Sequence, residues 1–314
     1  MTIEVLRQDV APAGRDLPAC AIRPRLGFAA AARAYLALTK PRIISLLLVT
    51  TVPTMIVAEG GMPSLWLILL TLIGGTLAAA GANTINCYID RDIDGIMART
   101  RERPLPAGTI APERALLFVI ALGAASFAIL AAGVNMLSAV LALAALAFYV
   151  FVYTIWLKRS TVQNIVIGGA AGAMPPLVGW AAVTGSLSWT ALVLFGIIFL
   201  WTPPHFWALA MRYRDDYARA GVPMLPVVRG ETETASQIVI YSVVLVATTL
   251  LLVPVAAMGA LYFASALALG GWFVWLAVRL WRERSPQSCR ALFMYSLAYL
   301  ALLYVSMGVD QLIA

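Results

Sequence analysis

The chain has 314 residues, of which 62% are hydrophobic and only 12% are charged, and its formal net charge is +7. Soluble domains carry about 25% charged residues, so the composition excludes a water-soluble fold. The basic residues are divided among short loops rather than gathered on one surface, which argues against a nucleic-acid-binding protein.

Nine apolar segments are long enough to cross a bilayer, since a spanning helix needs roughly 20 mainly apolar residues. We predict these segments at about 41–59, 64–86, 114–133, 136–156, 162–183, 189–210, 236–257, 259–280 and 290–310. The sequence therefore predicts an all-α polytopic protein in contact with the lipid bilayer.

The 22 Lys and Arg residues are sorted between alternate connections. They lie before or at the start of the first segment and then at 91–114, 158–159, 212–229 and 279–290. The other connections contain none, and only two acids, Glu59 and Asp310, lie on that side. Cationic loops are retained in the cytoplasm. We therefore predict an internal N-terminus, an external C-terminus and a cytoplasmic active site in a bacterial inner (plasma) membrane.

Residues 1–35 mix arginines with acids and lack an apolar core, so they do not form a secretory signal. We predict a mobile cytoplasmic leader there and a single transmembrane domain over 36–314. The three cysteines, Cys20, Cys87 and Cys289, fall on the predicted cytoplasmic side without metal-ligand spacing.

The connection at 87–113 is unusually long and polar for a compact helical protein. If the second helix continues into it, Asn86, Asp90 and Asp94 line one helical face at intervals of four residues. Like charges at this spacing repel each other, so a cation is expected, and Mg²⁺ fits because it binds through one or two carboxylates and substrate phosphates. Arg99 and Arg103 follow, and guanidinium groups suit phosphate oxygens.

A second long connection is predicted at 211–235, and it again combines arginines with acids. Arg212, Asp215 and Asp216 lie where a helix is expected to meet water. Two such loops facing one another would hold a diphosphate between metal ions.

The wording of these motifs resembles a known family. The segments LTKPRI, NCYIDRDIDGIMARTRERPLPAG, TIWLKRSTVQNIVIGGAAGAMPPLVGW and LWTPPHFWALAMRYRDDYARAGVPMLPVV are similar to the protoheme IX farnesyltransferases (heme O synthases), a branch of the intramembrane UbiA-type prenyltransferases. The resemblance covers the chain from Leu38 onward.

This resemblance implies nine helices around a central cavity that opens to the cytoplasm. It also implies farnesyl diphosphate and heme b as substrates, and heme o and diphosphate as products. By position, Asn86, Asp90 and Asp94 would bind Mg²⁺ and the diphosphate. Heme A synthase or a terminal oxidase is the implied protein partner.

The second motif departs from the wider superfamily, which has aspartates four and eight residues before the loop glycine. Counting back from Gly221 gives Tyr217 and Tyr213, which we place among the diphosphate-binding residues together with Arg212. Asp216 is our candidate for a second metal ligand. Asp215 is the alternative, unless it pairs with Arg212 or with Arg214.

Several cations and one histidine complete the expected site. Lys158 and Arg159 are candidate clamps on the departing diphosphate, although both equally satisfy the orientation rule. His205, the single histidine, is expected to ligate heme iron or to act as base for the attacking water; packing within the bundle is the alternative. Lys40 and Arg42 are expected to meet heme propionates or simply to anchor the first helix.

Two other functions remain compatible with the sequence. A sister prenyltransferase would use another aromatic or tetrapyrrole acceptor. A secondary transporter would share the helix count and the proline-broken helix, but the charges cluster at one mouth rather than at the bilayer midplane.

Overall fold

The computed structural model describes residues 27–313, which contain helices and no strand. The elements in chain order are α1 Phe28–Thr39, α2 Pro41–Glu59, α3 Leu65–Ile89, α4 Arg91–Ile96, α5 Pro112–Gly133, α6 Met136–Ala147, η1 Phe148–Leu157, α7 Lys158–Ser160, α8 Asn164–Gly172, α9 Met174–Thr184, α10 Trp189–Arg212, α11 Arg214–Arg219, α12 Leu225–Val228, α13 Gly230–Val255, α14 Ala260–Glu283 and α15 Pro286–Ile313. Most of the expected leader, including Cys20, lies outside the described residues.

The nine predicted spans are confirmed over residues 27–313, each by a helix long and apolar enough to cross a membrane. The fourth span joins α6, η1 and α7, and the fifth joins α8 and α9. The seventh span begins at Gly230 rather than near 236. The polar residues that start α13 continue its helix, so the predicted loop at 211–235 was too long.

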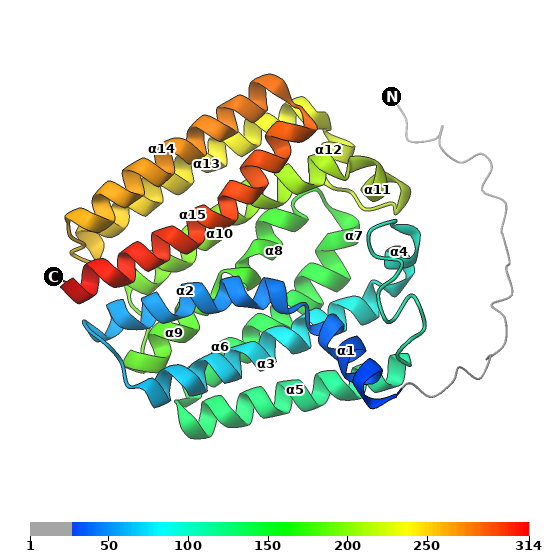
Figure 1. The fold of residues 1–314 in the computed structure, drawn as a ribbon, viewed down its shortest axis with the longest axis horizontal. Helices are drawn as coiled ribbons and strands as arrows, with labels where there is room; N and C mark the ends of the chain where they lie inside the picture. The colour runs from blue at the N-terminus through cyan, green and yellow to red at the C-terminus, as the bar shows by residue number, and fades with distance from the viewer. Residues whose placement is uncertain (1–26, 314) are drawn as a thin grey trace, which may run out of the picture.

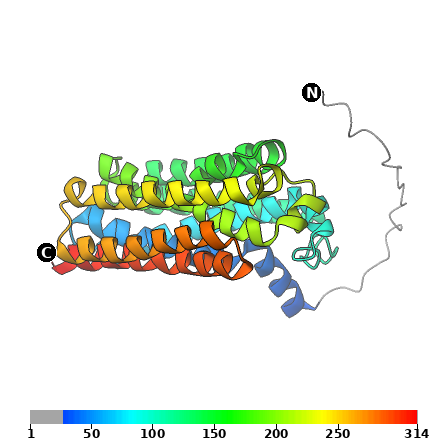
Figure 2. The ribbon, with the colours of Figure 1, turned by 90° about the horizontal axis from the view of Figure 1, so that it is seen from above.

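The spans form one bundle in which the last span packs against the first. In chain order α3 packs against α5, α10 against α13, and α14 against both α13 and α15. Finally, α15 packs against α2 (Figures 1 and 2). The short helices α4, α11 and α12 gather at the end opposite the C-terminus (Figure 1). The helical bundle is thus confirmed, while its orientation and its central cavity remain predictions.

The turns at the opposite end of the bundle, predicted to be external, are closed by side-chain caps. Ser64, Asn135 and Ser188 accept hydrogen bonds from the backbone N–H groups of the first turns of α3, α6 and α10. Such caps satisfy donors that have no partner within a helix. The start of α14 is capped instead from another helix, because Asp310 of α15 accepts from the N–H groups of Gly259 at 2.6 Å and Tyr262 at 3.0 Å.

Asp310→Ala is therefore expected to lower the stability of the folded protein by about 2 kcal/mol, since a partly buried and a buried N–H group at the start of α14 lose a charged acceptor. Thermal unfolding in detergent measures the change. Glu59→Ala is the matched control, because Glu59 is an exposed acid at the same end of the bundle. Equal midpoints for the two variants would contradict this role of Asp310.

The predicted orientation is tested by cysteine labelling in a background without native cysteines. Ser186 and Glu102 are both exposed. They belong to the α9–α10 and α4–α5 connections, whose flanking helix ends lie at opposite ends of the bundle (Figure 1). We expect Ser186→Cys to react with a membrane-impermeant thiol reagent in intact cells and Glu102→Cys to react only after permeabilisation. The reverse pattern would refute the charge-based orientation.

Candidate active site

The Asn86–Asp90–Asp94 motif lies at the junction of α3 and α4. The backbone N–H of Asp90 donates to the carbonyl of Asn86 at 2.9 Å, and that of Asp94 donates to Asp90 at 2.8 Å. The helical spacing therefore continues across the junction, and the three side chains share one side. All three are buried, with Asp90 0% exposed.

Three cationic side chains from separate segments meet this motif. Lys40 Nζ donates to Asn86 Oδ1 at 2.9 Å, Lys158 Nζ pairs with Asp90 Oδ2, and Arg103 Nη1 lies 2.7 Å from Asp94 Oδ2. Burial lowers the pKa of Lys40. Lys40 was expected to meet heme propionates or to anchor the first helix, and the structure places it beside Asn86. Carboxylates removed from water need such compensation, and the same cations suit an incoming diphosphate.

One oxygen of the cluster lacks a hydrogen-bond donor. Asp90 Oδ1 is buried and accepts no hydrogen bond from any described residue, and its nearest recorded cation, Arg159 Nη2, is 3.6 Å away. An unpartnered buried carboxylate oxygen is costly, and it fits a cation ligand. Within residues 27–313 no three His, Cys, Asp or Glu side chains group as a metal site. Two carboxylates and an amide are oxygen donors that suit Mg²⁺, which binds through one or two carboxylates together with substrate phosphates and water.

The wall facing this motif is a π-helix, η1, which the sequence did not reveal. Thr154 Oγ1 donates to the carbonyl of Tyr149, five residues earlier, at 2.8 Å, and lies 3.4 Å from Asn86 Nδ2. A five-residue turn brings Tyr153 and Lys158 toward the same side, and π-bulges occur frequently at functional sites. The glycine-rich helix α8 packs closely against this wall, because a Cβ at Gly168 would overlap the ring of Tyr153.

The two polar loops meet, as predicted. The guanidinium of Arg99 lies over the ring of Tyr213 at 5.4 Å, and that of Arg212 lies over the same ring at 5.6 Å. Tyr217 is buried, which raises the pKa of its hydroxyl, while the nearby Arg99 and Arg103 lower it. Tyr213 and Tyr217 therefore lie on the second loop where it approaches the first.

Other expected site residues are engaged elsewhere. Asp216 pairs with Arg219, and Arg214 pairs with Glu231 at 3.5 Å rather than with Asp215. Among the described residues Asp215 has no ion pair, and Arg42 is exposed without one. The last of these residues, Arg159, forms an ion pair with Asp92 through two hydrogen bonds.

Arg159 uses both Nη atoms to bind Asp92, each at 2.7 Å, and thereby ties α4 to the end of the fourth span. This guanidinium holds the pKa of Asp92 at about 2. Arg159 is thus committed to Asp92, whereas Lys158 reaches the buried Asp90.

His205 lies on α10 and faces α15. Its ring is stacked between Trp201 and Phe293 at centroid distances of 4.3 and 4.7 Å. Its Nδ1 is 2.7 Å from Ser296 Oγ. Ser296 donates its single hydroxyl proton to the carbonyl of Phe293, so it accepts from Nδ1–H. That tautomer leaves the Nε2 lone pair available, and no described residue hydrogen bonds to Nε2.

Comparison with known proteins identifies the family. The model of the UbiA prenyltransferase family matches residues 47–303. Protoheme IX farnesyltransferase from Gloeobacter violaceus is 58% identical over 290 residues, covering 92% of this chain and 94% of its own. Those from Synechocystis sp. (56%, 90% of each chain) and Clavibacter sepedonicus (54%, 93% and 96%) are similarly close. The chain belongs to the protoheme IX farnesyltransferases of the UbiA family.

Solved structures support the UbiA fold. A structure described as that of digeranylgeranylglyceryl phosphate synthase matches with a TM-score of 0.74 at 17% identity, covering 90% of this chain and 99% of that one. A UbiA homologue from Archaeoglobus fulgidus bound to DMAPP and Mg²⁺ matches with a TM-score of 0.59 at 18% identity, covering 88% and 99%. Together with the family assignment and the apolar helices, this fold makes the protein a multi-pass membrane prenyltransferase.

Proposed function

We propose that this protein transfers the farnesyl group of farnesyl diphosphate to a vinyl group of heme b, with addition of water, to give heme o and diphosphate. The observation that carries the proposal is the buried cluster at the α3–α4 junction, where Asp90 retains an unpartnered oxygen beside Lys158, Lys40 and Arg103. The names of the relatives supply the two substrates.

The first half of the reaction breaks the allylic C–O bond, and the electron pair leaves with the diphosphate. Lys158, Lys40 and Arg103 stabilise this growing negative charge, because preorganised cations in a water-poor site act strongly on it. Asp90 and Asp94, with Asn86, would hold Mg²⁺, which would supply further charge neutralisation. Asp216 remains our candidate for a second ligand, and Tyr213 and Tyr217 close the site from the other loop.

In the second half, the π electrons of the vinyl group form the bond to the farnesyl carbon. The cation left beside the macrocycle takes the oxygen of a water molecule, and one proton is released. We infer that His205 ligates the heme iron or accepts this proton through Nε2; the hydrogen bond between its Nδ1 and Ser296 supports this inference, because it leaves Nε2 available.

We place the protein in a bacterial inner membrane with the cluster facing the cytoplasm, since the basic loops adjoin the same end of the bundle. Heme o would pass to heme A synthase or to a terminal oxidase. The charged phosphate end of the donor would enter from the cytoplasm, while its isoprenoid chain stays among the spans.

The test uses the purified protein with heme b, farnesyl diphosphate and Mg²⁺, and identifies the products by mass. The proposal predicts a heme carrying one farnesyl group and one added water, with an equal amount of diphosphate. Hydrolysis of farnesyl diphosphate with unchanged heme would contradict it, and so would transfer to a quinone precursor in preference to heme.

A further inference from the structure

A polar groove lies beside α13, and the proposed reaction does not use it. It has a volume of about 110 Å³. This is several times the ~10–15 Å³ that one water molecule needs, yet far below the ~300–1,000 Å³ of pockets that bury a whole drug-sized ligand. The groove is therefore suited to a small polar group rather than to a porphyrin.

The buried wall of this groove carries an N–H group without a partner. Trp207 is 2% exposed, and its Nε1 finds no acceptor among the described residues. Its ring is fixed edge-to-face against Tyr241 at 5.3 Å. A buried donor without an acceptor is costly, so the geometry calls for an acceptor from outside the chain.

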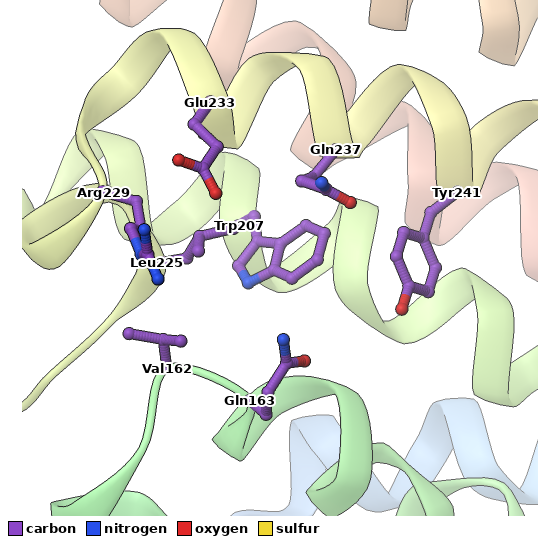
Figure 3. Close-up of a pocket in the computed structure, with 8 residues that line it drawn as sticks. All are labelled: Val162, Gln163, Trp207, Leu225, Arg229, Glu233, Gln237 and Tyr241. Atoms are coloured by element: carbon purple, nitrogen blue, oxygen red, sulfur yellow. The ribbon is translucent and has the colours of Figure 1, made fainter.

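The other polar side chains that line the groove also lack partners among the described residues. Arg229, Glu233, Gln237 and Tyr241 recur every four residues and share one face of α13 and its N-terminal flank. Gln163 faces them from the linker before α8 (Figure 3). Within residues 27–313 none of these side chains makes a hydrogen bond or an ion pair, and Arg229 and Glu233 do not pair with each other despite their spacing.

The groove runs from the N-terminal end of the seventh span into that span. Arg229 precedes the first residue of α13, and Tyr241 lies about 18 Å further along at a rise of ~1.5 Å per residue. Polar side chains on a spanning helix need polar partners. Basic pockets between spanning helices on the cytoplasmic side bind lipid headgroups.

We propose that this groove binds the headgroup of an aminophospholipid, which combines a phosphodiester with a primary ammonium group. The phosphodiester accepts hydrogen bonds from Trp207 Nε1, Arg229 and the Gln163 amide, and the ammonium group pairs with Glu233. A ligand of both charges would satisfy Arg229 and Glu233 together. Gln237 and Tyr241 then face the ester groups of the glycerol backbone.

The test measures lipid binding to the intact purified protein by native mass spectrometry, with phosphatidylethanolamine, phosphatidylcholine and phosphatidylglycerol added in turn. We expect phosphatidylethanolamine to bind about tenfold more tightly than the other two, because a charge-assisted hydrogen bond is lost with each of them. Equal affinity for the three lipids would overturn the proposal.

Two exposed positions give the variants. Arg229→Gln is expected to weaken phosphatidylethanolamine binding about tenfold, and Glu233→Gln is expected to remove the preference over phosphatidylglycerol. Arg282→Gln is the matched control, because it removes one exposed cation at the end of α14. Equal losses in Arg229→Gln and Arg282→Gln would refute the site. Displacement of the lipid by millimolar inorganic phosphate would assign the groove to a soluble anion instead.

Discussion

Asp90→Asn is expected to lower the rate of farnesyl transfer by about 10³-fold or more while the protein still folds. The change removes the charge that a divalent cation needs, and a metal's stabilisation of the leaving group amounts to several kcal/mol. Asp94→Asn should also lower the rate of farnesyl transfer. In the parent protein Arg103 contacts only one of the two Asp94 oxygens. Product formation by the purified variants, compared at equal amounts of folded protein, measures the effect.

The control for this prediction is Asp92→Asn. Asp92 belongs to the same turn, but its side chain is 59% exposed and binds only Arg159. We expect its rate to stay within a few-fold of the parent, since exposed ion pairs contribute little. EDTA should mimic Asp90→Asn in the parent protein, and added Mg²⁺ should reverse it. Full activity in Asp90→Asn would remove this cluster from the mechanism.

His205→Ala is expected to lower product formation by about 10²–10⁴-fold, the usual contribution of a positioned acid or base. The unpaired Nε2 is the chemical reason, because Ser296 holds only the other ring nitrogen. Steady-state turnover with heme b and farnesyl diphosphate measures the loss. Ser296→Ala should cost less, because the ring stays stacked between Trp201 and Phe293.

Heme spectra separate the two roles of His205. If it ligates iron, His205→Ala shifts the Soret band and weakens heme binding, while donor binding stays unchanged. If it is the base, the spectrum and heme binding persist and only turnover falls. A packing residue changes stability alone, so normal turnover per folded molecule would refute both roles.

The fold was largely predictable, because bilayer thickness sets helix length and the charges mark the loops. The same holds for the first motif, since the spacing of Asn86, Asp90 and Asp94 survives the junction between α3 and α4. The meeting of the two loops also followed from their composition. In the structure they meet where the Arg99 guanidinium lies over the Tyr213 ring.

Features that depend on tertiary packing could not be predicted. Nothing in the residues of η1 distinguishes a π-helix from an α-helix, so the approach of Thr154 to Asn86 was missed. The partners of long flexible cations were equally hidden: Lys40 binds Asn86 and Arg159 binds Asp92. The groove at Trp207 escaped notice because its walls come from segments about 20 to 80 residues apart.

The most direct test of the buried cluster is equilibrium binding of a non-hydrolysable farnesyl thiodiphosphate, measured by calorimetry with and without Mg²⁺. Our account predicts Mg²⁺-dependent binding to the parent and to Asp92→Asn. It also predicts binding about 100-fold weaker in Asp90→Asn, because only Lys158, Lys40 and Arg103 then hold the diphosphate. Equal affinity in Asp90→Asn and Asp92→Asn would show that the prenyl diphosphate binds elsewhere.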